Sequence, residues 1–410
     1  MNIEVVGYLL KCNVNTEIFN YSYEFPMDIA IKKGYLDIVN MLLVKNINVN
    51  LSRNGKESFL YSAVKFRHLD IVKSLCSFGA NINERCSFGV EEGFTPLMLA
   101  SKVGDQAIVS FLKHKGADIN AESVNKTTAL YHAVEENHID MVKLLLEWDA
   151  NTAVINTSAI ERKFTPLHVA CKNGSEKIVK LLLENKVEIN AQAWHNKTPL
   201  HLAIEYQHLN VVQLLLYYGA DTEALCNAWP EEELTPLHLA CKYKNSKIVL
   251  ALLNKKVDIN KIFFGGYTAL YVAILNLNLM SAQLLLERGA EVDNMIVHTL
   301  SLTWRFTLLI MACKKSFSLV VKLLLSNVVN ENNIIQTWIP SQILPVKINY
   351  KIIYLARDPE NNKFYTCNQI KELITVVKNQ QPLITIAKKP HHSFILNYLK
   401  KYLFALNLQQ

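Results

Sequence analysis

The chain is 410 residues long, 50% of them apolar and 19% charged, and its formal net charge is +7. Residues 330–410 hold ten Lys and Arg against four Asp and Glu (10 − 4 = +6), so the preceding residues are close to neutral. They lack the basic stripe of a nucleic-acid-binding surface, and the sequence has neither a secretory signal nor an apolar run of about 18 residues that would predict a membrane segment.

The first predicted element is a short helix within residues 2–15, which read NIEVVGYLLKCNVN. Ile3, Val6, Leu9 and Leu10 recur at helical spacing and form one apolar face. The polar residues that follow predict a turn, so this segment is expected to be a single amphipathic helix.

From residue 26 onward the sequence repeats with a period of 70 residues. Four prolines, each followed by an apolar residue and, four positions on, by an alanine, stand at this interval: Pro26, Pro96, Pro166 and Pro236. The same pattern recurs between them at four further positions: Phe59, Ala129, Pro199 and Ala269. A fixed period of this size is typical of stacked supersecondary units and not of a globule with one active-site cleft.

Two short helices are predicted within one such unit, residues 164–190. Thr165 is a suitable N-cap, and Pro166 occupies the first helical position, where its missing N–H is not needed. Gly174 lies in the polar segment that ends this helix. The second helix is apolar around more than half its circumference, with Ile178, Val179, Leu181, Leu182 and Leu183. Such a helix must be covered on both flanks, as neighbouring copies in a stack would do.

These units resemble the ankyrin repeat. The Thr-Pro-Leu-His-x-Ala motif of that family is intact where it begins at Thr165, Thr198 and Thr235. Relaxed versions begin at Phe25, Ser58, Thr95, Thr128, Thr268 and Thr307. The resemblance covers residues 1–328 as nine copies preceded by a half copy. It implies an all-α solenoid of helix-turn-helix units with short β-hairpin-like fingers, and it does not identify a partner, because fold does not determine function.

The array is expected to begin in the middle of a repeat. Residues 2–15 match the second helix and exit turn of a unit without its first helix, so the apolar face has an uncovered flank. Natural arrays close with a polar cap. We therefore expect that the chain starts inside a longer protein, with a domain upstream of Met1.

After the array, residues 329–346 are predicted to be an irregular linker, because they lose the repeat and contain Pro340 and Pro345. Residues 347–410 are interpreted as a divergent helical region of degenerate ankyrin copies, with a helix from Tyr350 to Leu355. A competing interpretation is that residues 343–355 are similar to the opening helix of an F-box, in which Leu-Pro precedes an apolar helical run.

The eight cysteines have no CxxC or Cys/His ligand spacing. Cys171, Cys241 and Cys313 share one register and are interpreted as small buried apolar residues, which favours a reducing compartment, most simply the cytoplasm. His391-His392 has no acidic or cysteine neighbours, so no metal site is predicted, and no cofactor is expected.

His168, His201 and His238 recur because the motif recurs. The resemblance implies that this histidine forms a structural hydrogen bond near the turn, and we therefore predict no catalytic residue and no enzymatic activity. Every second copy also carries extra residues, at 85–93, 156–163 and 227–233, which predict longer fingers on one face.

The resemblance places partner contacts on the fingers and on the concave ends of the first helices. The predicted partner-binding residues are Trp194, His195, Tyr206, Lys242, Tyr243, Phe264, Tyr267 and Trp304. Aromatic side chains next to charges are typical of interface anchors, and those on the three consecutive copies from Trp194 to Phe264 are expected to cluster. The alternative is that Trp194 and Phe264 merely cover the apolar flank of an adjacent finger.

The predicted function is a non-catalytic cytoplasmic scaffold that binds another protein through its concave face and fingers. The first alternative is the substrate-recognition subunit of a ubiquitin ligase, should the F-box-like segment be genuine. The second is a fragment of a latrotoxin-like or other multidomain ankyrin protein.

Overall fold

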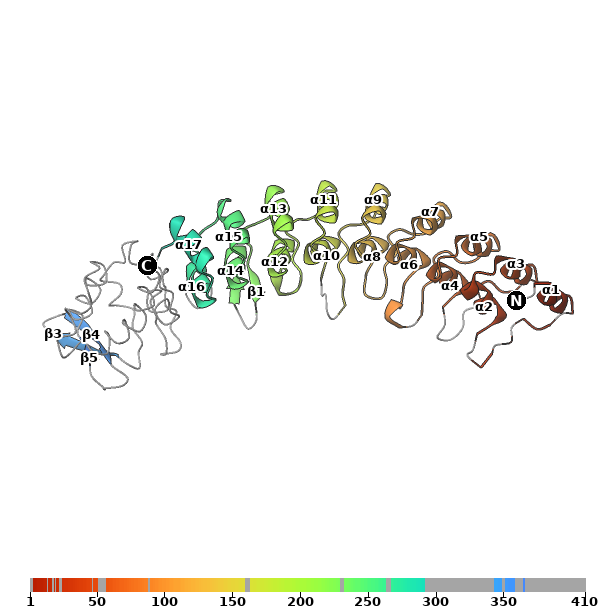
Figure 1. The fold of residues 1–410 in the computed structure, drawn as a ribbon, viewed down its shortest axis with the longest axis horizontal. Coiled ribbons are helices and arrows are strands. Elements are labelled where there is room, and N and C mark those ends of the chain that lie inside the picture. Colours follow the sequence, from red (N-terminus) through yellow and green to blue (C-terminus); the bar gives the residue numbers. More distant parts are fainter. Residues whose placement is uncertain are drawn as a thin grey trace, which may run out of the picture. The chain divides into compact units, whose positions relative to one another are not determined.

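A computed structural model of the chain contains two compact units, Met1–Gly219 (unit 1) and Ala220–Gln410 (unit 2). The structure describes residues 3–291 apart from 13, 17, 19, 22–23, 46, 51–56, 88, 159–162, 229–231 and 263–266, together with the backbone of 343–348, 351–357 and 364–365. In unit 1 the helices form two rows, an inner row from which the connecting loops project and an outer row behind it (Figure 1).

The inner row of unit 1 consists of α2 (Pro26–Lys33), α4 (Phe59–Lys65), α6 (Pro96–Lys102), α8 (Ala129–Glu135), α10 (Pro166–Asn173) and α12 (Pro199–Glu205). The outer row consists of α1 (Ile3–Lys11), α3 (Leu36–Val44), α5 (Leu69–Ser77), α7 (Gln106–His114), α9 (Ile139–Glu147), α11 (Glu176–Glu184) and α13 (Leu209–Tyr217). Two single 3-10 turns, η1 (Gly89–Glu91) and η2 (Trp194–Asn196), lie in the connecting loops.

The inner helices begin and end where the sequence predicts. The side chain of Thr165 accepts a hydrogen bond from the backbone N–H of His168, and Pro166 is the first residue of α10. α10 ends at Gly174, which adopts the left-handed conformation at a φ of 72° and donates its N–H to Ala170 and Cys171 carbonyls. These contacts satisfy backbone groups that a short helix leaves unpaired at its ends.

The core of unit 1 is a continuous seam between the two rows. The motif alanines of the inner helices are at most 1% exposed: Ala30, Ala63, Ala100, Ala133, Ala170 and Ala203. Each outer helix from α3 to α13 contributes a fully buried valine: Val39, Val72, Val109, Val142, Val179 and Val212. Each inner helix packs against its outer partner and against the inner helix of the next copy, as α6 does with α7 and α8. The small alanine side chains allow this close approach of helices.

α1 packs against α3 in the way that successive outer helices pack, which confirms that residues 3–11 form an outer-type helix. On its other flank, Val5, Tyr8 and Leu9 are 52%, 69% and 48% exposed, whereas Leu10 is buried. Of the face predicted to be uncovered, Leu9 is exposed, but Val6 is half-buried and Leu10 is buried, so the prediction is wrong for Leu10 and the exposed flank consists of Val5, Tyr8 and Leu9.

Unit 2 begins with a short antiparallel hairpin, β1 (Cys226–Ala228) and β2 (Glu232–Leu234). It continues with α14 (Pro236–Lys242), α15 (Ser246–Leu253), α16 (Ala269–Leu275) and α17 (Leu279–Glu287). α14 packs against α15 and α16, and α17 packs against α15 and α16, so the same two-row arrangement recurs within this unit.

The longer fingers predicted at every second copy are hairpins closed at equivalent residues. Cys86 and Phe94 are joined by a backbone hydrogen bond of 2.8 Å, and Asn156 and Phe164 by one of 2.9 Å. Cys226 pairs with Leu234 in the third hairpin. These positions are 70 residues apart, so each long finger is closed at the equivalent pair of residues.

The C-terminal prediction requires a correction. Residues 343–348 form β3 and residues 351–357 form β4, which pair as an antiparallel hairpin, and β5 (Phe364–Tyr365) pairs with β4. The predicted helix from Tyr350 to Leu355 is therefore wrong at residues 351–355, and so is the irregular linker at 343–346. β-Branched residues are frequent in both segments and favour strands, and Pro345 disfavours a helix interior. The other parts of residues 329–346 and 347–410 lie outside the described residues.

Candidate partner-binding surface

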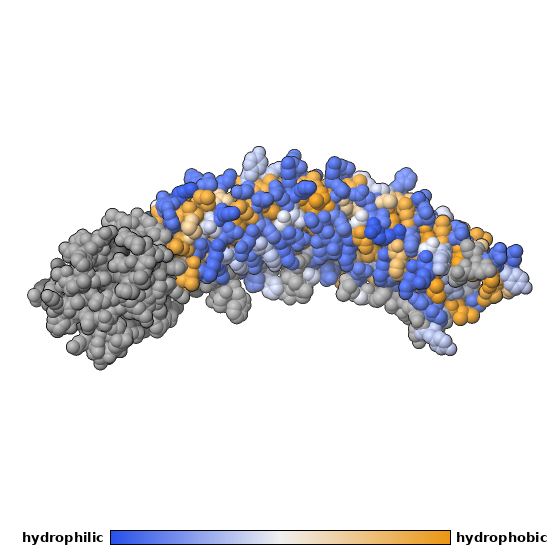
Figure 2. All heavy atoms as spheres, in the orientation of Figure 1, coloured by the Kyte–Doolittle hydropathy of each residue, from blue (hydrophilic) through white to orange (hydrophobic). Residues whose placement is uncertain are grey.

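The inner helices of unit 1 carry a row of charged and aromatic side chains at their C-terminal ends. Lys65, Phe66, Glu135 and Glu136 are exposed, and Phe66 and Tyr206 leave 38% and 47% of their surface accessible. In the space-filling view the middle of unit 1 is mainly hydrophilic, with hydrophobic residues scattered among the hydrophilic ones (Figure 2).

Ion pairs run along the inner helices from the base of the finger to the helix end. In the α12 copy, Lys197 Nζ lies 2.6 Å from Glu205 Oε2, and both side chains are 25% exposed. In the α4 copy, Glu57 and Lys65 form a pair at equivalent positions with the charges reversed. The α12 copy therefore has its positive charge at the base of the finger and its negative charge at the helix end, and the α4 copy has the reverse.

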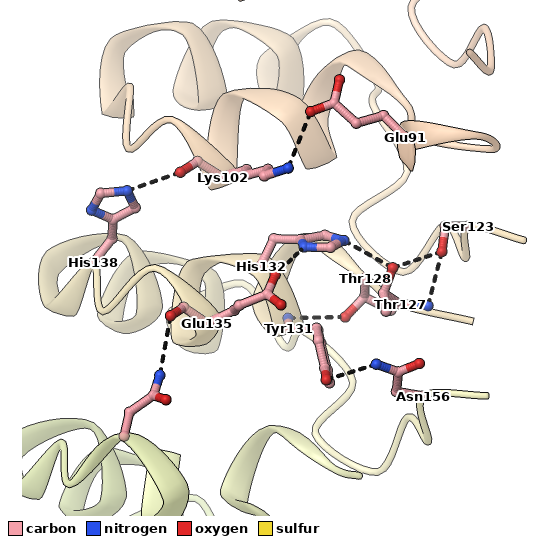
Figure 3. Close-up of polar contacts among 11 residues, drawn as sticks. Glu91, Lys102, Ser123, Thr127, Thr128, Tyr131, His132, Glu135, His138 and Asn156 are labelled. Atoms are coloured by element: carbon pink, nitrogen blue, oxygen red, sulfur yellow. Dashed lines mark hydrogen bonds and ion pairs between the residues drawn. The ribbon is translucent and has the colours of Figure 1, made fainter. Parts of the chain in front are cut away.

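Glu91, from the first long finger, connects two neighbouring inner helices. It accepts a hydrogen bond of 2.7 Å from the Tyr61 hydroxyl of α4. Its Oε1 lies 3.1 Å from Lys102 Nζ of α6 (Figure 3). Burial alone would raise the pKa of Glu91, but the hydrogen bonds from Tyr61 and Lys102 outweigh it and hold the pKa below its usual value. Glu91 is therefore an anion that fixes the finger to the helices.

His132 forms a second polar cluster in the next copy. Its Nδ1 lies 3.0 Å from Glu135 Oε2, and its Nε2 lies 2.8 Å from Thr127 Oγ1, which is 2.6 Å from Ser123 Oγ (Figure 3). The hydrogen bond from His132 lowers the pKa of Glu135 and outweighs the opposing effect of burial. Because such groups already have partners within the protein, a ligand that covers them must desolvate existing pairs, which offsets much of the gain.

The structure holds two of the predicted aromatic residues in exposed, stacked positions. Trp194 lies in η2, is 45% exposed and stacks on His195, with ring centroids 4.7 Å apart and an interplanar angle of 9°. Tyr206 follows α12 and stacks on His208 at 6.5 Å and 7°. Their exposure agrees with the prediction, and their role in binding stays a prediction.

In unit 2, Lys242 is the last residue of α14 and Tyr243 is its C-cap, and both are half-buried. Tyr267 stacks on Tyr271 with ring centroids 4.3 Å apart. Phe264 and Trp304 lie outside the described residues. The predicted cluster combines residues of both units, and it stays a prediction.

The motif histidines have the structural role that the resemblance implies. His168 is fully buried, and its Nδ1 lies 2.8 Å from Thr165 Oγ1 while its Nε2 lies 3.1 Å from the Lys197 carbonyl oxygen. His238 Nδ1 is 2.7 Å from Thr235 Oγ1. Burial lowers the pKa of His168 and His238 to about 4, so both rings are neutral at pH 7.

The predicted buried cysteines are also in place. Cys171 and Cys241 are 0% exposed, and burial raises the pKa of both thiols. Cys313 lies outside the described residues. Within the described part of the chain, no group of three or more His, Cys, Asp or Glu side chains is placed to hold a metal ion. The helices described there are all too short or too polar to cross a membrane.

Sequence reasoning missed the cationic and aliphatic residues on the fingers of unit 1. Val124 is 61% exposed and Ile155 is 44% exposed, and Lys126 and Lys163 are exposed beside them. The 70-residue period could have revealed the exposure of Val124, because Val124 precedes Trp194 by one period and occupies the equivalent finger position.

A stack of paired helices with projecting fingers, whose histidines are buried in structural hydrogen bonds, defines a helical repeat protein. The model of the family described as ankyrin repeats (3 copies) matches residues 1–86, 60–157, 153–226 and 222–296. The chain therefore belongs to the ankyrin-repeat family, whose repeats generally mediate protein–protein interactions.

Individual relatives are similar over about a third of the chain. The ankyrin repeat protein FPV031 of fowlpox virus (strain NVSL) is 34% identical over 133 residues, which are 31% of this chain and 38% of that protein. The ankyrin repeat protein FPV223 of the same virus is 29% identical over 141 residues, 34% of this chain and 94% of that protein. Transient receptor potential cation channel subfamily A member 1 of Homo sapiens is 30% identical over 160 residues, 36% of this chain and 13% of the channel. The chain thus spans well under half of FPV031 and of the channel.

Proposed function

We propose that this chain is a non-catalytic scaffold that binds a partner protein through the inner ends of its helices and its fingers. The family supports protein binding in general terms, and the inner face supplies a specific candidate surface. The motif histidines do not compete with this proposal as catalytic groups, because His168 and His238 are buried and hydrogen-bonded to the threonine N-caps.

The observation that carries the proposal is the pair of exposed, stacked aromatic residues Trp194 and Tyr206. Each leaves nearly half of its surface accessible while a histidine ring supports one face. An aromatic ring held in this way offers a large contact area and loses little conformational entropy on binding. Tyr243, the C-cap of α14 in unit 2, is proposed as a separate anchor from its own position after the inner helix.

The buried cysteines suggest the cellular compartment in which the protein would act. Cys171 and Cys241 are buried free thiols, and a reducing environment such as the cytoplasm suits such residues. A protein partner, rather than nucleic acid, agrees with the near-neutral charge of residues 1–329. The ubiquitin-ligase alternative rested on a helix in residues 343–355, where the structure has strands, so no observation favours it.

The proposal is tested by quantitative affinity capture with the full chain and with a Trp194→Ala/Tyr243→Ala variant. If these residues are anchors, each truncation should weaken binding by about 30-fold, as expected for the loss of about 2 kcal/mol at a hot spot. Recovery of the specific partners should therefore fall almost to background.

Tyr217→Ala is the matched control, because Tyr217 is 79% exposed on the outer helix α13. This variant should recover partners as the wild type does. Unchanged recovery of every specific partner by the Trp194→Ala/Tyr243→Ala variant, or a loss of recovery caused by Tyr217→Ala alone, would contradict the proposed surface.

A further inference from the structure

Three successive fingers of unit 1 each present one exposed apolar side chain. Val124 lies between α7 and α8, Ile155 between α9 and α10, and Trp194 between α11 and α12. They are 61%, 44% and 45% exposed. Adjacent copies of a helical stack are separated by about 10 Å, so these side chains span a line of about 20 Å.

Two of these three fingers carry an exposed lysine. Lys126 and Lys163 are exposed, and both adopt a left-handed backbone, at φ values of 59° and 65°. Neither lysine side chain has an ion-pair partner within the described part of the chain. The acidic residues Asp118 and Glu188 cap turns near the outer helices, where their carboxylates accept from Asn120 and Asn190 N–H groups.

Backbone hydrogen bonds join the Val124 finger to the fingers on both sides of it. The Val124 N–H donates to the Glu92 carbonyl of the preceding finger at 3.5 Å, and the Thr157 N–H of the Ile155 finger donates to the Asn125 carbonyl at 2.9 Å. Val124, Lys126 and Ile155 therefore lie on fingers that are bonded together and not on independent loops, which reduces the entropy lost on binding.

In the third finger, Trp194 precedes two residues whose backbone conformation is unfavourable for residues with a side chain. His195 and Asn196 both have positive φ, 60° and 54°, a conformation in which glycine is preferred. At the positions equivalent to His195 the sequence has Gly55, Asn125 and Gly265. The histidine keeps its ring stacked under Trp194 at 4.7 Å. Backbone strain of this kind is found where a side chain is positioned for binding.

We propose that Val124, Lys126, Ile155, Lys163, Trp194 and His195, the finger strip, dock an extended acidic segment of a partner protein that carries apolar side chains. Trp194 is the anchor, His195 is its positioning residue, and the two lysines attract the carboxylates. This inference rests on the proposed scaffold function and names the chemistry of the partner. A segment of about six or seven residues in extended form spans the strip.

The charge of the lysines and the aliphatic side chains of the finger strip favour an acidic peptide segment with apolar residues. Two lysines that have no ion-pair partner among the described residues, beside three apolar side chains, match carboxylates alternating with apolar groups. A single-stranded nucleic acid would instead require a basic groove with several stacking rings, and Val124 and Ile155 cannot stack on bases. Nucleic acid is therefore the alternative that the experiment must separate.

The test is a selection of random dodecapeptides displayed on phage against the purified full chain. Enriched peptides should be net acidic and contain aromatic or aliphatic residues. Resynthesised with a fluorescent label, they should bind more weakly at high salt, as a lysine–carboxylate interaction requires. Trp194→Ala should weaken their affinity at least tenfold, and Lys126→Glu/Lys163→Glu should weaken it about tenfold and remove most of the salt dependence.

Two control variants match these changes away from the strip. Lys73→Glu/Lys180→Glu makes the same charge change on α5 and α11, at side chains 50% and 60% exposed, and Tyr217→Ala removes an exposed ring from α13. Both should bind the selected peptides within twofold of the wild type.

The His195→Gly variant distinguishes a role of His195 in positioning Trp194 from a role in stabilising the fold. Glycine accepts the left-handed turn, so the urea midpoint should stay equal or rise, while peptide affinity should fall at least threefold because Trp194 loses its support. A changed midpoint with unchanged affinity would show that His195 is only structural and would overturn its assignment.

The inference fails if no peptide is enriched, if enriched peptides are neutral or basic, or if Trp194→Ala binds them as the wild type does. It also fails if a single-stranded 20-mer of deoxythymidine displaces them. If the peptide test fails but capture of partner proteins still depends on Trp194 and Tyr243, only the finger-strip proposal is wrong and the proposed scaffold function stands. If neither partners nor peptides depend on the inner face or the fingers, both proposals fail.

Discussion

At the scale of single residues, the motif histidine shows how a polar side chain becomes part of the core. The His168 ring contacts Thr165 at the start of its own helix and the Lys197 carbonyl of the following finger. It thereby satisfies groups on two copies while 0% of its surface is exposed. The charged imidazolium would lose its hydration there, which is why the pKa of His168 is lowered to about 4.

Acid should therefore destabilise the array through these histidines. An unfolded histidine has a pKa of about 6.5, so between that pH and about 4 the unfolded chain binds more protons than the folded one. The stabilisation is complete above pH 6.5 and is lost as the pH falls toward 4. At about pH 4.5 we expect the loss of ~2 kcal/mol for each of His168 and His238, measured by urea unfolding at that pH and at pH 7.

His168→Gln supplies the comparison. Glutamine does not titrate, so the difference in stability between the two pH values should shrink relative to the wild type, whatever the variant's stability at pH 7. His114→Gln, at an exposed position of α7, should keep the wild-type difference. An equal difference in all three proteins would exclude His168 as a source of acid sensitivity.

At the scale of helices and turns, the 70-residue period corresponds to two alternating contacts between copies. In one, a glycine with a φ of 72° or 73° lies under a histidine ring from the next copy: Gly34–His68, Gly104–His138 and Gly174–His208. In the other, the same turn has a longer side chain that contacts a polar residue, as Arg67 does with Asp105 at 3.3 Å. Two kinds of interface explain why the repeat unit is a pair of copies.

Gly174→Ala should destabilise unit 1 by about 1–3 kcal/mol. An alanine Cβ would lie 2.5 Å from His208 Nδ1, and the φ of 72° is unfavourable for a residue with a side chain. The His208 ring is also held by its Nε2, 3.0 Å from the Lys172 carbonyl oxygen, so moving it disrupts a second contact. Urea unfolding measures the change.

Gln207→Ala is the control at the equivalent turn of the next copy. Gln207 already has a φ of 62° and is exposed, so truncating it should change the unfolding free energy by less than about 0.5 kcal/mol. Similar effects of the two substitutions would mean that the histidine contact does not distinguish the two interfaces.

At the scale of the whole molecule, unit 1 is a linear seam in which every copy packs only on its neighbours. The helix contacts of α6, for example, are with α7 and with the inner helices α4 and α8. Stability in such an array is a sum of copy and interface contributions. Damage to one copy is therefore expected to act mainly on that copy and the adjacent ones.

Leu112→Ala in α7 tests this locality. Leu112 is 0% exposed, and its truncation should remove about 2–5 kcal/mol from the local core. Amide hydrogen exchange should accelerate most in α6 and α7, less in the adjacent copies, and least in α12 and α13. Equal acceleration in every helix of unit 1 would instead indicate a single cooperative core.

Much of the fold could be predicted because its signals are local. The threonine N-cap of α10, the proline at its first position and the glycine after it act within a few residues of the chain. The long fingers recur with a 70-residue period that the sequence itself displays. The C-terminal hairpin was missed, since an apolar run such as residues 351–357 fits both a helix and a strand, and partner strands decide between them.

The candidate site could be predicted only in part. The exposure of Trp194 and Tyr206 follows from their register in the repeat, but the stacking histidines require the folded turn. The pair Lys197–Glu205 is eight residues apart and forms only when the finger returns to the end of α12. Its position in the sequence carries no sign of that contact.

The sequence by itself determined that paired helices repeat, where each begins and ends, and which small residues lie between them, because helix caps and periodicity are short-range properties. Only the tertiary structure decided which charges are already paired across the inner face and which lysines, Lys126 and Lys163, stand beside exposed apolar side chains on adjacent fingers. Those relations join residues from different copies, and distances between copies exist only once the helices have packed.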